Sequence, residues 1–81
     1  MSGYKATVRE RFNSGFHDGV IDVERGFHKK GRFGVPMNDF LNSHFDQVYA
    51  AGVRAGIAAA KSKKDCTLSD AAWAEYISQK A

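Results

Sequence analysis

The chain has 81 residues, of which 43% are hydrophobic and 26% charged, so it has room for one small domain and too much apolar content for a disordered tail. Its single cysteine, Cys66, excludes an internal disulfide framework and predicts a reducing compartment. No stretch reaches the roughly 20 apolar residues of a membrane span, and no signal peptide is visible. We therefore expect one soluble, cytoplasmic domain spanning residues 1–81.

The basic residues are gathered at two places, although the net charge is +3 from 12 basic and 9 acidic residues. The first basic cluster contains Arg25, Lys29, Lys30 and Arg32. The second contains Lys61, Lys63 and Lys64. Small basic clusters are most often solvated surface, and they also suit contacts with phosphates.

Apolar residues in the first third of the chain recur every three or four positions, which is the spacing of one buried helix face. The residues on this stripe are Tyr4, Val8, Phe12, Phe16, Val20, Val23 and Phe27. They predict a helix over about 3–29, with Ser2 as its N-cap and Gly31 or Gly34 at its end. A β-hairpin over 20–35, turning at Lys29-Lys30-Gly31, is the alternative for the end of this segment.

Two further helices are expected after a break at Gly34-Val35-Pro36, where proline disfavours a helical predecessor. One runs over 38–62, with Asn38 or Asp39 as its cap. The other is short, covers 68–80, and starts at a capping box from Thr67 to Asp70. The predicted fold is all-α, an antiparallel hairpin of two long helices plus a short C-terminal helix.

A repeat inside the long helices goes beyond amphipathic spacing. Phe12-x-x-Gly15-Phe16-x-x-Gly19-Val20 has the same form as Tyr49-x-x-Gly52-Val53-x-x-Gly56-Ile57. Each glycine in a helix interior costs roughly 1 kcal/mol against alanine, so the repeat predicts a compensating close approach of the two helices. If the hairpin turns about Val35-Pro36, Gly15 faces Gly56 and Gly19 faces Gly52. A groove left open for a partner is the alternative role of these glycines.

The same repeat resembles the pattern of ribosome modulation factor, a family of small basic bacterial proteins with two helices and paired glycine-aromatic segments around a proline turn. Gly15-Phe16, Gly19-Val20, Gly52-Val53 and Pro36 carry the resemblance, which covers about residues 12–57. It implies a ribosome-binding, non-enzymatic protein that contacts RNA of the small subunit. Val35-Pro36-Met37 stands where the family has a Cys-Pro-aromatic turn, and no contact residue is carried over.

Residues that carry catalytic or metal chemistry are sparse. His17, His28, His44 and Cys66 lack the spacing of a zinc site. Asp18 and Asp22 share a helix face at i, i+4, but nothing in the sequence indicates a cleft around them. No glycine-rich phosphate loop is present. We expect a non-enzyme that uses neither a metal ion nor a cofactor.

Two kinds of function fit these features. The first is a small RNA- or ribosome-binding module in which cations contact phosphates and an aromatic ring stacks on a base. The residues expected to make these contacts are Arg25, Lys29, Lys30, Arg32 and Phe33. A second basic pole would consist of Lys61, Lys63 and Lys64. The alternative is a small inhibitor or adaptor, phage-encoded for example, that docks on a larger host protein complex through Phe40, Phe45, Trp73 and Tyr76. Self-association into a homodimer through an uncovered apolar stripe is a third expectation.

Overall fold

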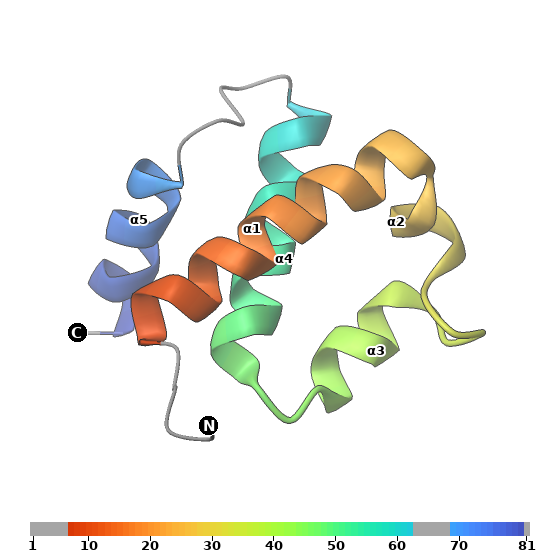
Figure 1. Ribbon diagram of the computed structural model, residues 1–81, viewed down its shortest axis with the longest axis horizontal. Helices are drawn as coiled ribbons and strands as arrows, with labels where there is room; N and C mark the ends of the chain where they lie inside the picture. Colours follow the sequence, from red (N-terminus) through yellow and green to blue (C-terminus); the bar gives the residue numbers. More distant parts are fainter. Residues whose placement is uncertain (1–6, 63–68, 81) are drawn as a thin grey trace, which may run out of the picture.

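The structure, a computed structural model, describes residues 7–62 and 69–80, and its regular elements there are all helices (Figure 1). They are α1 (Val8–Arg25), α2 (Phe27–Lys30), α3 (Met37–Ser43), α4 (Gln47–Lys61) and α5 (Asp70–Lys80). The predicted all-α class is therefore confirmed. In this part of the chain, none of the helices has the length and apolar character needed to cross a membrane. Expectations made for Ser2, Lys63, Lys64, Cys66 and Thr67 lie outside the described residues.

Helix α1 is shorter at both ends than the predicted helix over 3–29. Thr7 is its N-cap: the Thr7 hydroxyl accepts from the Glu10 N–H at 3.1 Å, and the Glu10 carboxylate accepts from the Thr7 N–H at 2.8 Å. This capping box begins the helix at Val8. Gly26 ends it, because its φ of 81° is left-handed and turns the chain away from the helix axis. The following residues form the separate short helix α2.

The predicted second helix over 38–62 is interrupted between α3 and α4. Asp46 causes the break, because its carboxylate accepts from two backbone N–H groups in the first turn of α4, at 3.1 and 3.2 Å, and so caps a new helix. The side-chain amide of Gln47 donates to the carbonyl of Leu41 at 3.1 Å, in addition to the 3.4 Å bond that this carbonyl accepts from the His44 N–H at the end of α3. Phe45, which the predicted helix over 38–62 contains, consequently lies in the connection between α3 and α4.

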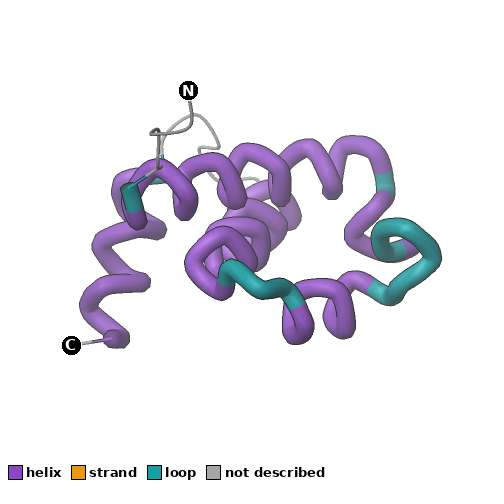
Figure 2. Tube along the Cα trace, turned by 60° about the horizontal axis from the view of Figure 1, so that its bottom comes forward, coloured by secondary structure: helices purple, strands orange, loops and turns teal. Residues whose placement is uncertain are grey.

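The alternative β-hairpin over 20–35 is wrong, because α1 and α2 occupy most of that segment. Within the described ranges, β-type pairing is limited to an isolated bridge between Arg32 and Val35. It closes a two-residue turn at Phe33-Gly34, in the loop that Figure 2 shows between α2 and α3.

The crossing of α1 and α4 is the centre of the fold (Figures 1 and 2). All four glycines of the repeat lie in this crossing. A methyl group on Gly15 or Gly19 would lie 2.1 or 2.3 Å from a backbone carbonyl oxygen of α4. The reverse holds for Gly52 and Gly56, at 2.2 and 2.1 Å from carbonyl oxygens of α1. The two helices therefore pack backbone against backbone. In this arrangement, contacts from glycine Cα–H groups to carbonyl oxygens offset part of the cost of glycine in a helix.

The register of the crossing differs from the predicted one. Gly15 lies against Gly52, and Gly19 lies against Gly56. The two residues of each pair are 37 positions apart in the sequence. Because residue numbers rise together along the two helices, α1 and α4 cross in a parallel sense, and the antiparallel hairpin is wrong. The reason is visible in Figure 1: α2 and α3 carry the chain back before α4 begins.

The apolar core surrounds this crossing. Phe12 and Phe16 of α1 are 1% and 2% exposed, and Val53 of α4 is fully buried between the two helices. Met37 and Leu41 of α3 pack against α4 on the other side. The core therefore joins α1 to α4 on one side of α4 and α3 to α4 through a second set of contacts.

Helix α5, which matches the predicted helix over 68–80 except at its start, packs on the first half of α1. The rings of Trp73 and Tyr76 lie 5.3 and 5.1 Å from the ring of Phe12, centroid to centroid. The guanidinium of Arg9 lies 5.6 Å from the Trp73 ring. Two residues predicted as interface candidates, Trp73 and Tyr76, are therefore half-buried in the joint between α1 and α5.

Candidate functional site

The turn between α2 and α3 presents Phe33 in an unusual conformation. Arg32 and Val35 close the turn by two backbone hydrogen bonds of 2.9 and 2.8 Å. Phe33, at the tip, has a φ of 53°, a left-handed conformation that no other non-glycine residue of the described ranges adopts. This conformation costs a bulky residue roughly 1–2 kcal/mol. The ring gains little in return, because it is 92% exposed, and strain of this kind is typical of functional residues.

Arg32 anchors this turn to the two crossed helices. Its guanidinium forms an ion pair with Asp22 of α1 and donates to the Tyr49 hydroxyl of α4 at 3.1 Å. The Tyr49 hydroxyl in turn donates to Asp18 of α1 at 2.5 Å. The side chain of Asp22 is 4% exposed, so the ion pair is largely shielded from water. The network fixes the base of the Phe33 turn against α1 and α4.

The protonation states of the network follow from its contacts. Burial lowers the pKa of Arg32, but the hydrogen bonds to Asp22 and Tyr49 outweigh it and leave the pKa above its ordinary value. Burial raises the pKa of Tyr49; the bond from Arg32 opposes this rise, and the bond to Asp18 adds to it. Arg32 is therefore a permanent cation, and Tyr49 is a neutral hydroxyl that donates to Asp18.

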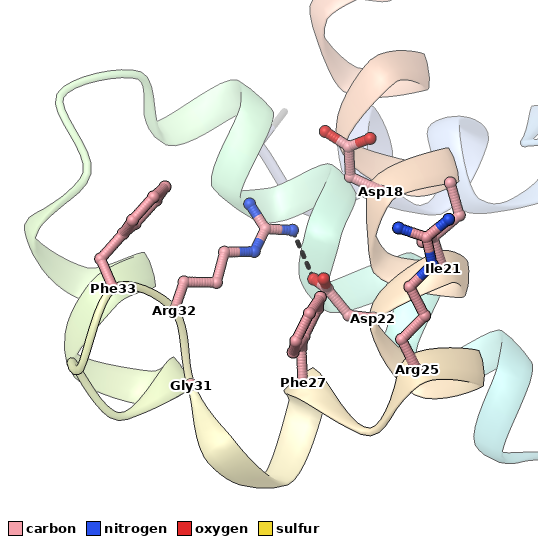
Figure 3. A pocket seen from close by; sticks show the side chains of 8 residues that line it. All are labelled: Asp18, Ile21, Asp22, Arg25, Phe27, Gly31, Arg32 and Phe33. Atoms are coloured by element: carbon pink, nitrogen blue, oxygen red, sulfur yellow. Dashed lines mark hydrogen bonds and ion pairs between the residues drawn. The ribbon is translucent and has the colours of Figure 1, made fainter.

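A pocket of about 330 Å³ lies beside this network (Figure 3). Its lining comes from α1, α2 and the turn, and consists of Asp18, Ile21, Asp22, Arg25, Phe27, Gly31, Arg32 and Phe33. In Figure 3 the guanidinium of Arg32 reaches toward Asp22 in the middle of the group, with the aromatic and charged side chains around it. Aromatic walls combined with a few polar groups are typical of ligand sites.

Three exposed cations lie at this end of α1 and on α2 without a hydrogen bond or ion pair to any described residue. They are Arg25 in the pocket wall, and Lys29 and Lys30 on α2. The other four arginines each donate to a side-chain oxygen: Arg9 to Asp70, Arg11 to Asp46, Arg32 to Asp22 and Arg54 to Asn42. An unpaired exposed cation can neutralise an external anion without first breaking an internal bond.

The structure brings part of the predicted basic cluster to one place and changes the role of Arg32. The same pocket is lined by Arg25, Arg32 and Phe33. Lys29 and Lys30 are the last two residues of α2 and come directly before the pocket residue Gly31 in the sequence. Arg32 is bound internally, so it positions the turn and is not a free cation. Of the second basic pole, Lys61 is exposed at the end of α4, and its two other members lie outside the described residues.

Aromatic side chains continue from the turn along one side of the molecule. We call the rings of Phe33, Phe40, His44 and Phe45 the aromatic ridge. Successive centroids in it lie 6.3, 5.4 and 4.9 Å apart, and the rings of His44 and Phe45 are stacked. The guanidinium of Arg32 lies over the Phe40 ring, 5.2 Å from its centroid, in a cation–π contact that stabilises the aromatic ridge. Its two ends, Phe33 and Phe45, are 92% and 95% exposed.

The sequence identifies the basic and aromatic residues of this site but not the residues that hold them. Spacing alone pairs Asp18 with Asp22 without indicating a cleft, and it places Tyr49 only in the helix repeat. The Arg32–Asp22 pair joins residues 10 positions apart that no helix or strand spacing links, so the sequence carries no signal for it. No group of three or more potential metal ligands occurs among the described residues.

Comparisons of the chain with protein-family models, with curated proteins and with solved structures found no match. The resemblance of the glycine repeat to ribosome modulation factor therefore stays a prediction.

Proposed function

We propose that the protein is a non-enzymatic module that binds single-stranded RNA at the Phe33 turn. Lys29 and Lys30 neutralise backbone phosphates, and the ring of Phe33 stacks on an unpaired base. The observation that carries this proposal is Phe33 itself: an aromatic ring held in a strained conformation at the tip of an anchored turn, almost fully exposed, and close in sequence to unpaired cations.

The chemistry of single-stranded nucleic acid matches this arrangement. Cations along a groove track the phosphates, and exposed aromatic rings provide stacking platforms worth about 1–3 kcal/mol per base. A base paired within a duplex offers no free face, so an exposed ring at a turn selects loops, bulges and single strands. The resemblance of the repeat to ribosome modulation factor favours ribosomal RNA as the target and a cytoplasmic location.

Replacing Phe33 by asparagine is expected to separate function from stability. An asparagine directly before Gly34 makes the sequence that two-residue turns of this type prefer, because asparagine tolerates a left-handed φ. We expect the free energy of unfolding to rise by about 1 kcal/mol and the affinity for single-stranded RNA to fall about tenfold through loss of stacking. Urea denaturation and fluorescence anisotropy with a labelled RNA measure the two effects on the same sample.

The control is Val35→Asn, which changes an exposed residue of the same turn but leaves the Phe33 ring in place. It should leave RNA affinity within about twofold of the unchanged protein. A Phe33→Asn protein that binds RNA as tightly as the unchanged chain would remove Phe33 from the site and with it the proposal.

A second candidate function, docking on a protein, is favoured by Phe45. Its ring is 95% exposed at the far end of the aromatic ridge, away from the unpaired cations in sequence, and is held by stacking on His44 at 4.9 Å. Large exposed aromatic residues are frequent anchors of protein interfaces. A pull-down from bacterial extract, divided into untreated and ribonuclease-treated halves, separates the two functions: a protein complex that survives nuclease treatment and high salt, and is lost in Phe45→Ala, supports docking.

A further inference from the structure

The pocket beside Phe33 offers one acceptor group and one donor group from the same face of α1. Asp18 and Arg25 both line it, seven residues and thus two turns apart, which is about 10 Å along the helix axis. The Asp18 carboxylate accepts from the Tyr49 hydroxyl through Oδ2, and no described residue donates to its second oxygen. The Arg25 guanidinium has no hydrogen-bond partner in the described ranges, so all its donors are available.

The charges of the pocket disfavour an ionic ligand. Its two aspartates and two arginines cancel formally, and one pair, Asp22 with Arg32, is already joined. A phosphate would meet the Asp18 carboxylate, and a lysine or arginine of a protein partner would meet Arg25. A neutral ligand that carries N–H donors at one edge and acceptors at another meets neither repulsion.

The walls of the pocket favour a flat ligand. Phe33 and Phe27 are 92% and 41% exposed, and Ile21 is 39% exposed, so the rim presents apolar surface to an incoming ring. The volume of about 330 Å³ lies at the lower end of the range for small-molecule sites, which suits one heterocycle and excludes a duplex.

Resting on the proposed function, we infer that this pocket binds a single guanine base of the RNA. Guanine has adjacent N1–H and amino donors, which a carboxylate accepts, and its O6 and N7 acceptors are the usual partners of arginine. Asp18 therefore takes the donor edge, Arg25 takes the acceptor edge, and Phe33 covers the ring. Lys29 and Lys30 remain outside the pocket, on the phosphates. Uracil presents a carbonyl oxygen where guanine presents its amino group, and adenine lacks the N1–H, so both fit this pair of residues less well.

The test compares single-stranded RNAs that differ at one base. The probes are a labelled heptamer of adenines and the same heptamer with guanine or uracil at its centre, measured by fluorescence anisotropy with the full chain. We expect the guanine heptamer to bind about tenfold more tightly than the other two, which is the discrimination typical of one bidentate base contact. In Asp18→Asn, which keeps the shape and an acceptor for Tyr49 but removes the carboxylate, the ratio should fall to about one.

Two further variants separate base reading from effects on charge and structure. Asp70→Asn changes the net charge equally at an exposed site on α5 and should keep the guanine preference. Tyr49→Phe removes the hydroxyl that donates to Asp18 but keeps the carboxylate, and it should also keep the preference. If Tyr49→Phe abolishes the preference as fully as Asp18→Asn does, the network has a structural role alone and the inference is wrong.

The outcomes also distinguish this inference from the function on which it rests. Equal binding of the three heptamers by the unchanged protein contradicts guanine recognition and leaves RNA binding standing. Absence of binding to all three contradicts both. A guanine preference that Asp18→Asn removes and Asp70→Asn retains supports both.

Discussion

Gly52→Ala is expected to lower the free energy of unfolding by about 3 kcal/mol, which corresponds to a fall in Tm of about 12–24 °C for a domain of this size. Its new methyl group would lie 2.2 Å from the backbone carbonyl oxygen of Phe12, and a backbone atom cannot move aside as a flexible side chain can. The two helices must therefore separate. Thermal denaturation followed by circular dichroism measures the change.

The direction of this result is informative, because helix propensity alone predicts the opposite sign. Alanine is a better helix former than glycine by about 1 kcal/mol. Ala58→Gly, at an exposed position of the same helix, measures the effect of helix propensity alone. It should lower the free energy of unfolding by about 1 kcal/mol. A Gly52→Ala protein that is as stable as the unchanged chain, or more so, would contradict backbone-to-backbone packing at the crossing.

Asp22→Ala is expected to cost about 3 kcal/mol, because it leaves the charged guanidinium of Arg32 largely shielded from water without its counter-ion. The Tyr49 hydroxyl cannot replace the lost carboxylate, because it is a neutral group and already accepts from Arg32. The turn that carries Phe33 should loosen at the same time. Urea denaturation measures the stability, and the accessibility of the turn to a protease measures its order.

The matched comparison is Asp70→Ala, which breaks the exposed pair between Arg9 and Asp70. The Asp70 side chain is 76% exposed, so this change should cost less than about 1 kcal/mol. A double-mutant cycle of Asp22→Ala with Arg32→Met then isolates the coupling, which should be at least about 2 kcal/mol. Independent effects of the two substitutions would show that Arg32 does not depend on Asp22.

The sequence predicted which helices meet but not the direction in which they cross. The apolar stripe and the glycine repeat depend on local spacing, and both identified real parts of α1 and α4. The crossing sense depends on where the chain turns back, and that is decided by Gly26 and Asp46, two residues that interrupt otherwise helical patterns. A capping residue within a stretch of helically spaced apolar residues can either continue one helix or begin a new one. At Asp46 a new helix begins, because the Asp46 carboxylate caps α4 and the Gln47 amide bonds back to α3.

For the candidate site, the sequence predicted the exposed basic and aromatic residues but not the residues that hold Arg32 in place. Lysine, arginine and phenylalanine clustered over 25–33 are visible in any reading of the chain, since exposed residues need no tertiary contact to be recognised. The inward role of Arg32 depends on Asp22 and Tyr49, which lie 10 and 17 positions away. Such pairs are set by the fold, so a basic residue in a cluster cannot be assigned to a ligand until its internal partners are known.

The most direct measurement is the salt dependence of RNA binding by the unchanged protein and by the double variant Lys29→Ala/Lys30→Ala, followed by anisotropy of a labelled single-stranded RNA of about ten nucleotides. Two phosphate contacts on a single strand predict a slope of about −1.4 for the logarithm of the binding constant against the logarithm of the salt concentration. The Kd of the unchanged protein should therefore rise about sevenfold between about 50 and 200 mM salt. The Lys29→Ala/Lys30→Ala variant should lose most of this salt dependence. The control Arg9→Gln/Arg54→Gln removes equal charge at two arginines that already donate to side-chain oxygens of the protein, and it should retain the salt dependence. Equal salt dependence in the unchanged protein and the Lys29→Ala/Lys30→Ala variant, or no binding at any salt concentration, would contradict RNA recognition at the Phe33 turn.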